Sequence, residues 1–141
     1  MSDSRVPLAV KRRVAQRARQ RCEYCQTPEL CSPAGFCVEH IVPASAGGSS
    51  SAENLAFACA GCNGHKADKV QGIDPATGRL VRLFHPRSDE WARHFKWSAD
   101  GLCVEGRTII GRATLAALKL NRDGLLNLRR LLVNDGAHPP S

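Results

Sequence analysis

Two cysteine pairs with identical spacing constrain what this chain can fold into. Two residues separate Cys22 from Cys25, and the same spacing separates Cys59 from Cys62. A pair spaced in this way places both thiolates on one turn within reach of a single Zn²⁺, and two such pairs complete a tetrahedral sulfur site. We therefore expect a structural zinc that holds the segment between the pairs in place.

The cysteine count also bears on the cellular compartment. The chain has seven cysteines, an odd number, and its first residues lack the apolar run of a signal peptide. We expect a cytoplasmic, reducing setting, in which paired cysteines bind metal and do not form disulfides. The unpaired Cys31, Cys37 and Cys103 are predicted to be small buried apolar residues. Cys31 and Cys37 lie close enough to the first pair to compete as zinc ligands.

The charge balance favours an anionic partner. Lysine and arginine number 20 against 13 aspartates and glutamates, which gives the 141 residues a formal charge of +7. This favours nucleic acid over an acidic small-molecule substrate. No run of apolar residues reaches membrane-spanning length.

Basic residues gather near the start of the chain, where a helix is predicted over residues 7–21. No acidic residue interrupts them between positions 5 and 21. A basic helix of this kind neutralises phosphates and binds DNA without regard to sequence. A solvated helix face is the alternative interpretation. The basic residues are Arg5, Lys11, Arg12, Arg13, Arg17, Arg19 and Arg21.

Between the cysteine pairs the pattern predicts a short strand that Pro43 ends, a flexible loop rich in glycine and serine, and a returning antiparallel strand. A helix is expected from the second cysteine pair onward, with Gly72 after its end. In order, these four elements span residues 36–42, 44–52, 54–58 and 62–70.

After this core we expect a turn at residues 74–78 between two short strands, of which residues 80–84 form the second. Residues 91–97 are predicted to form a short helix or an extended arm, and residues 103–110 a strand or half of a hairpin. Two helices, at residues 112–120 and 122–133, close the chain, and Asn121 and Asp123 offer caps. Residues 134–141 are expected to be a disordered tail.

A histidine, an asparagine and a second histidine follow one another in order: His40, Asn54 and His65. Together with the two cysteine pairs and the Glu39-His40-Ile41-Val42-Pro43 string, they resemble the HNH endonucleases, in the branch whose ββα-metal core is braced by four cysteines. The resemblance runs from about Cys22 to Lys66. Residues 72–87, 91–95 and 110–114 also resemble a C-terminal extension of bacterial members.

The resemblance implies an α+β fold with a ββα-metal (His-Me finger) core, a structural zinc site of four cysteines, an N-terminal basic helix and C-terminal helices. We expect one nuclease domain over residues 1–133, with its core at 22–72 and its extension at 73–133. The implied activity is metal-dependent hydrolysis of phosphodiester bonds in DNA, most simply double-stranded DNA, by nicking or cleavage.

This chemistry needs an activated water, charge stabilisation and help for the departing oxygen. His40 is the expected general base, because an imidazole with a pKa near 6.5 is neutral at cellular pH, and the resemblance assigns it that role. Asn54 is expected to orient the loop that carries His40. Lys66 and the helix residues Arg12, Arg13 and Arg17 are expected to contact phosphate.

Glu39 and His65 are expected to hold one divalent cation, which polarises the scissile phosphate. The donor set suits Mg²⁺, Mn²⁺, Ni²⁺ or Zn²⁺. Asn63 competes with His65, because family members differ in the helix position that supplies this ligand. Neighbours in a strand point to opposite faces, so Glu39 and His40 reach one site only if the strand ends or bends there.

Two alternatives stay open. A non-catalytic zinc-stabilised module would bind nucleic acid through the basic helix, and a purely structural zinc domain would serve in a larger assembly. The remaining histidines, His85, His94 and His138, are predicted to be packed or surface residues.

Overall fold

The computed structural model describes residues 6–140, which form two compact units. Unit 1 comprises the chain up to Val70 together with His85–Asp89, and unit 2 comprises Gln71–Phe84 and the chain from Glu90 onward. The single domain expected over residues 1–133 stays a prediction. Arg5, the first of the basic residues, lies outside the described residues.

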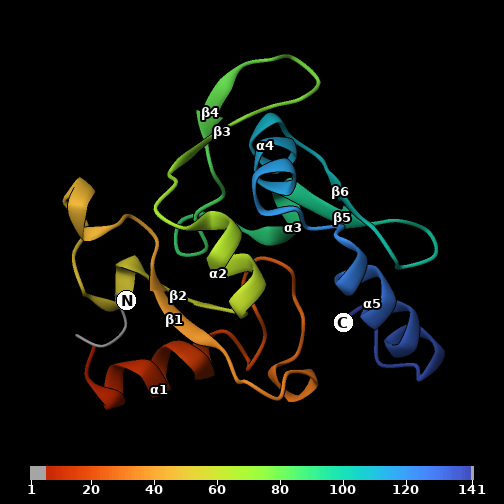
Figure 1. The fold of residues 1–141 in the computed structure, drawn as a ribbon, viewed down its shortest axis with the longest axis horizontal. Coiled ribbons are helices and arrows are strands. Elements are labelled where there is room, and N and C mark those ends of the chain that lie inside the picture. Colours follow the sequence, from red (N-terminus) through yellow and green to blue (C-terminus); the bar gives the residue numbers. More distant parts are fainter. Residues whose placement is uncertain (1–5, 141) are drawn as a thin grey trace. The chain divides into compact units, whose positions relative to one another are not determined.

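Unit 1 is built on a short antiparallel hairpin that lies between two helices (Figure 1). The strands pair from Cys37 opposite Ala58 to His40 opposite Leu55. The elements are α1 (Leu8–Arg17), β1 (Cys37–His40), β2 (Leu55–Ala58) and α2 (Ala60–Lys66). The predicted order of helix, strand, returning strand and helix is therefore confirmed.

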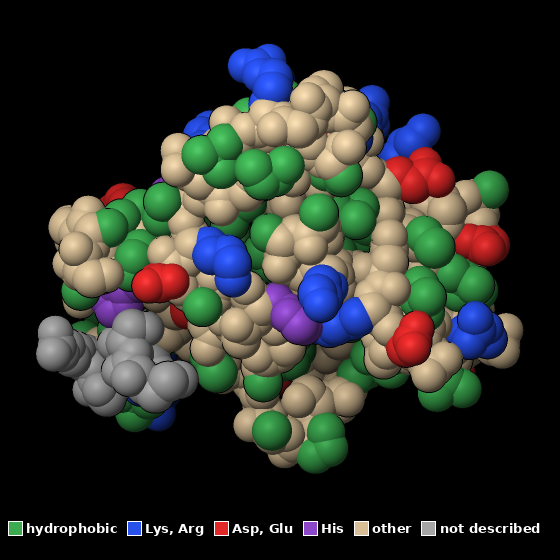
Figure 2. Space-filling model, turned by 45° about the horizontal axis from the view of Figure 1, so that its top comes forward, with side chains coloured by type: hydrophobic (Ala, Val, Ile, Leu, Met, Phe, Trp, Pro, Cys, Tyr) green, Lys and Arg blue, Asp and Glu red, His purple; other side chains and the backbone are tan. Residues whose placement is uncertain are grey.

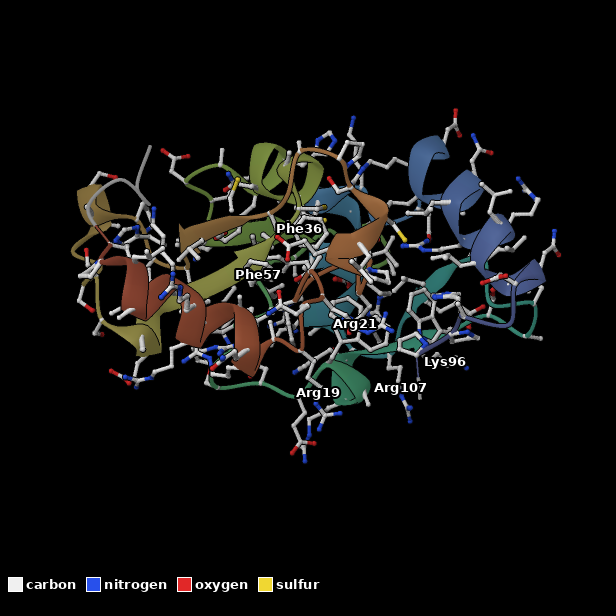
Figure 3. The ribbon with its side chains drawn as sticks, turned by 90° about the horizontal axis from the view of Figure 1, so that it is seen from below. Arg19, Arg21, Phe36, Phe57, Lys96 and Arg107 are labelled. Atoms are coloured by element: carbon white, nitrogen blue, oxygen red, sulfur yellow. The ribbon has the colours of Figure 1, made fainter. Side chains whose placement is uncertain are left out.

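One face of the hairpin packs against α1 through apolar side chains. Val14 of α1 and Leu55 of β2 are fully buried, and Val38 and Phe57 belong to the same cluster. The rings of Phe36 and Phe57 lie against each other, with centroids 5.4 Å apart (Figure 3). Each such side chain stabilises the fold by about 1.5–3 kcal/mol when fully buried.

Both helices of unit 1 are shorter than the sequence predicts. α1 ends at Arg17, because Arg19 and Gln20 adopt positive φ angles of 56° and 57° that turn the chain toward the first cysteine pair. α2 ends at Lys66, because Ala67 has a φ of 50°. The loop expected over residues 44–52 contains a short 3₁₀ turn, Ala44–Ala46, and a second one follows at Ala52–Asn54.

Unit 2 contains two small hairpins and three helices within the described residues. β3 pairs with β4, and β5 pairs with β6, both antiparallel. The elements are β3 (Gln71–Ile73), β4 (Leu80–Arg82), α3 (Trp91–His94), β5 (Phe95–Trp97), β6 (Val104–Gly106), α4 (Ile109–Leu118) and α5 (Asp123–Asn134). The predicted β3–β4 hairpin and both closing helices are confirmed, and residues 91–97 form a short helix followed by a strand. Of the two interpretations of residues 103–110, the hairpin holds, although β6 ends at Gly106 and α4 already begins at Ile109.

The helix caps expected at Asn121 and Asp123 are wrong. The side chain of Asn121 pairs with Val104 of β6, accepting a hydrogen bond from the backbone N–H at 2.8 Å and donating one to the carbonyl at 2.9 Å. Arg122 is the residue that precedes α5, and it makes no side-chain cap, while Asp123 lies in the first turn. Asn121 therefore extends the hydrogen bonding of β6 and does not start the helix.

The stretch expected to be a disordered tail is packed at His138. This side chain is buried, its ring meets that of Trp97 edge to face at 4.3 Å, and Nε2 lies 2.9 Å from the carbonyl oxygen of Gly101. His94 is also buried, with Nδ1 2.6 Å from the hydroxyl of Thr108. Both histidines are thus packed residues.

A buried carboxylate organises the turn between β3 and β4. Asp74 accepts hydrogen bonds from the N–H of Ala76 at 3.1 Å and the hydroxyl of Thr77 at 2.7 Å. The Arg112 guanidinium of α4 binds both carboxylate oxygens at 2.9 Å. This arginine, helped by the turn, lowers the pKa of Asp74 below its usual range. The hairpin is thereby fastened to α4.

We expect Arg112→Met to lower the melting temperature, because it leaves a buried carboxylate without its cation. Because the pKa of folded Asp74 is depressed, the stabilisation is present above the unfolded value of about 3.9 and is lost as the pH falls below it. The decrease in melting temperature should therefore be large at neutral pH and shrink in acid. Arg107→Met, which alters an exposed arginine of the same unit, is the control. Equal melting temperatures for the two variants at neutral pH would contradict this account.

Candidate active site

The four paired cysteines converge on one point in unit 1. Their sulfur atoms all lie within 4.8 Å of one another, and the sulfurs of Cys25 and Cys59 are 3.7 Å apart. Zinc–sulfur bonds of about 2.3 Å in a tetrahedron place sulfurs about 3.8 Å apart. The donor set and its spacing therefore fit one structural zinc. Cys31 and Cys37, the competing ligands, are not part of this cluster.

Both cysteine pairs form the same kind of turn. The N–H of Cys25 donates to the sulfur of Cys22 at 3.5 Å, and the N–H of Cys62 donates to the sulfur of Cys59 at 3.4 Å. Cys59 is also the N-cap residue of α2. Contacts with Cys22 and the other two thiols lower the pKa of Cys59 far below its usual value. A thiolate at this position suits a bound cation.

A cavity of about 620 Å³ lies within unit 1. Glu39 and His40, at the end of β1, both line it. β1 ends at His40, which is the condition under which two neighbouring side chains of a strand can reach one site. Residues of α2 and of the chain after it form another part of the wall: Ala60, Asn63, Gly64, Ala67 and Asp68.

Glu39 belongs to a buried polar network. Its side chain is 4% exposed, and its carboxylate lies 3.5 Å from the ammonium of Lys66. The hydroxyl of Tyr24 lies 3.5 Å from each carboxylate oxygen. Burial raises the pKa of Glu39 to about 7, although Lys66 opposes that shift. The carboxylate is therefore held in place by two partners at the cavity wall.

Lys66 lies in the interior and not on the surface, where a phosphate contact was expected. It is 2% exposed, and its ammonium donates to the carbonyl of Ile41 at 2.8 Å and that of His40 at 3.4 Å. These bonds tie α2 to the end of β1. Lys66 is therefore buried and bonded to groups at the end of β1, and the phosphate contact expected of it stays a prediction.

Asn54 closes the loop that follows His40. Its side-chain oxygen accepts from the N–H of Val42 at 2.9 Å, and its side-chain nitrogen donates to the carbonyls of Val42 at 2.9 Å and Ser49 at 2.7 Å. Gly48 makes this closure possible, because a Cβ there would lie 1.8 Å from the carbonyl oxygen of Val42. The loop also brings the Ser50 hydroxyl to 2.9 Å from Nε2 of His40.

The two competing residues of α2 lie on different faces of the helix. Asn63 lines the cavity, and His65 is not among its lining residues. At 3.6 residues per turn, a separation of two residues corresponds to about 200° around the helix. His65 is therefore directed away from the cavity face on which Asn63 lies.

Asp68 and Cys37 line the cavity as well, although the sequence pattern assigns neither of them to it. Asp68 lies beyond the end of α2, where the chain has left the helix at Ala67, so no helical spacing in the sequence could have placed it at the cavity. Cys37, predicted to be a small buried residue, is half-buried and lines the cavity as well. The other unpaired cysteines, Cys31 and Cys103, are also half-buried.

The basic residues of α1 differ in their surroundings. Arg12 and Arg13 are exposed. The guanidinium of Arg17 donates to the carbonyl of Leu55 in β2 at 2.9 Å, and partial burial lowers its pKa. All three arginines are exposed, but only Arg17 also helps to fasten α1 to the hairpin.

Comparison with known families bears on this core. Residues 22–69 match the model of the HNH endonuclease family. This segment belongs to the HNH endonuclease family. The match spans both cysteine pairs, the β1–β2 hairpin and α2, and the mixed α+β structure agrees with the ββα-metal fold of that family.

HNH proteins are typically endonucleases, so the family implies nuclease activity, a nucleic-acid substrate and a divalent metal. No curated protein and no solved structure gave a significant match to the chain. Among the described residues, no helix has the length and apolar character needed to cross a membrane.

We expect removal of zinc to unfold unit 1. Structural zinc sites contribute about 10–16 kcal/mol of binding free energy, which is comparable to the whole stability of a typical domain, about 5–15 kcal/mol. Cys62→Ser should therefore lose zinc and the cooperative unfolding transition, as measured by metal analysis and thermal denaturation. Cys103→Ser, in unit 2, is the matched control and should keep both. A Cys62→Ser protein that retains one zinc per chain and its melting temperature would contradict the assignment.

Proposed function

We propose that unit 1 is a metal-dependent endonuclease that hydrolyses DNA phosphodiester bonds with His40 as the general base. The observation that supports this most is the convergence of Glu39, His40 and Asn63 on one cavity within the segment that matches the HNH family. The zinc cluster is made of other residues and serves to brace the core.

His40 suits the role of base because its orientation is defined. Its Nε2 lies 2.9 Å from the hydroxyl of Ser50, in the loop that Asn54 closes. An imidazole that is neutral near pH 7 accepts a proton from an attacking water. Asn54 and Lys66 are proposed to hold His40 in place and not to react themselves. Asn54 binds the backbone of Val42, and Lys66 binds the backbone of His40.

The chemistry of three side chains that line the cavity suits a divalent cation. Glu39 and Asp68 offer carboxylate oxygens and Asn63 an amide oxygen, a set that favours Mg²⁺ or Mn²⁺ over softer metals. A cation bound there would polarise the phosphate and stabilise the departing oxygen. We propose Asn63, and not His65, as the helix ligand, because Asn63 lies on the cavity face of α2. The exposed arginines at positions 12 and 13 are proposed to contact phosphates.

One observation favours a second candidate function. The Glu39 carboxylate is already held by Lys66 and Tyr24, as expected of a structural network in a non-catalytic zinc module that binds nucleic acid. Such a module would bind DNA in a salt-dependent way and leave it uncut.

The role of His40 as general base is tested by comparing the wild type with His40→Ala. The measurement is the conversion of supercoiled plasmid to nicked or linear DNA in the presence of Mg²⁺, Mn²⁺, Ni²⁺ or chelator. We expect cleavage by the wild type that needs added metal, and a decrease of about 10²-fold or more in His40→Ala. Zinc content measured on the same preparations shows that the variant is folded. Bound but uncut plasmid with the wild type at every metal would instead support the non-catalytic module.

The cation ligand is tested with two variants of α2. Asn63→Ala should raise the metal concentration needed for half-maximal cleavage by about 10-fold or more. Mutating a residue that merely supports a metal ligand already lowers metal affinity by about 10-fold, so the loss of a ligand itself should cost at least as much. His65→Ala, on the opposite face, is the matched control and should leave the metal requirement unchanged. The reverse outcome would return the ligand role to His65.

A further inference from the structure

We propose that the β3–β4 hairpin of unit 2 is a DNA-contacting ribbon that enters a groove of the duplex. The inference rests on the proposed function for the identity of the partner, and it gives a role to a segment outside the residues that match the HNH family. Four features of the hairpin support it: its packed inner face, its exposed apolar pair, its charge and its anchorage.

The inner face of the hairpin is packed. Gly72 and Val81 form the middle pair, and β3 and β4 both contact α4. A Cβ on Gly72 would lie 3.0 Å from Cδ2 of Leu83 and 3.3 Å from the carbonyl oxygen of Ala113 in α4. The backbone of β3 approaches α4 so closely at Gly72 that a larger side chain would not fit. The residues before and after Gly72 point to the other face of the hairpin, away from this packing.

The outer face carries two cross-strand pairs with exposed side chains. Ile73 lies opposite Leu80, and Gln71 lies opposite Arg82. Ile73 is 54% exposed and Leu80 is 59% exposed. In Figure 2, in which the top of Figure 1 comes forward, hydrophobic and basic side chains lie together over this hairpin. Side chains this exposed contribute little to the core and are accessible to a partner.

The exposed charge of the hairpin is entirely basic. Within residues 71–82 the charged side chains are Asp74, Arg79 and Arg82. Asp74 is buried and neutralised by Arg112, whereas Arg79 and Arg82 are exposed. The Arg82 guanidinium also donates to the carbonyl of Leu83 at 3.3 Å. A surface with this charge complements a polyanion and does not suit a second copy of itself.

A two-stranded ribbon is one of the elements that the major groove of DNA admits, and apolar side chains there contact thymine methyl groups. Ile73 and Leu80 are the residues that enter the groove, and Arg79 and Arg82 bind the flanking phosphates. The bonds between Asp74 and Arg112 hold the ribbon rigidly on α4, so little conformational entropy is lost on binding.

The test is duplex binding by full-length protein carrying His40→Ala, measured by fluorescence anisotropy over a range of salt concentrations. Adding Arg79→Ala and Arg82→Ala should reduce the slope of log K against log salt by about 1 for each phosphate that the protein no longer neutralises. Adding Ile73→Ser and Leu80→Ser should weaken binding about 10-fold or more with an unchanged slope, because these side chains meet bases and not phosphates.

Lys96→Ala with Arg107→Ala is the matched control, since it removes two exposed basic residues elsewhere in the same unit (Figure 3). It should change binding much less than the hairpin variants. Equal decreases in affinity from the arginine pair and the control pair, or no decrease from the hairpin pairs, would overturn the proposal. A self-association that Leu80→Ser abolishes would also overturn it, in favour of a contact between copies.

Plasmid cleavage with His40 intact separates this proposal from the proposed function. If the wild type cuts plasmid and the hairpin variants bind as the wild type does, the hairpin proposal fails and the nuclease stands. If the hairpin variants bind more weakly but the wild type cuts nothing at any metal, the ribbon stands and the nuclease fails.

Discussion

The convergence of four cysteine sulfurs is the constraint on which unit 1 depends. Its sheet has two strands of four residues each, and an isolated hairpin of that size is marginally stable in water. A metal bound by Cys22, Cys25, Cys59 and Cys62 would join the chain before β1 to the first turn of α2. With the metal bound, the apolar cluster has to stabilise only the side of the hairpin that faces α1.

On the side of the hairpin toward α2, polar groups take the place of an apolar core. Lys66 binds Glu39 and two backbone carbonyls at the end of β1, while Asn54 closes the loop that follows. Buried charges of this kind cost desolvation free energy and add little stability. They hold the side chain of Glu39 and the backbone of His40 in fixed positions at the cavity, as the proposed hydrolysis would require.

Features with a strict spacing or a strong local preference could be predicted from the sequence. These include the cluster of four cysteines, the β1–β2 hairpin and the turn that begins at Asp74. Tertiary contacts decided the rest. The burial of Lys66 and the pairing of Asn121 with β6 depend on partners distant in sequence. The position of Asn63, and not His65, at the cavity depends on which face of α2 is turned toward β1, and the order of residues in the chain does not determine that face.

X-ray absorption at the zinc edge of the purified protein would show whether one zinc bound by four thiolates holds this site together. We expect four sulfur neighbours at about 2.3 Å and no nitrogen ligand. A mixed sulfur and nitrogen shell, or fewer than four sulfurs per zinc, would contradict it and would place zinc among the histidines of the chain.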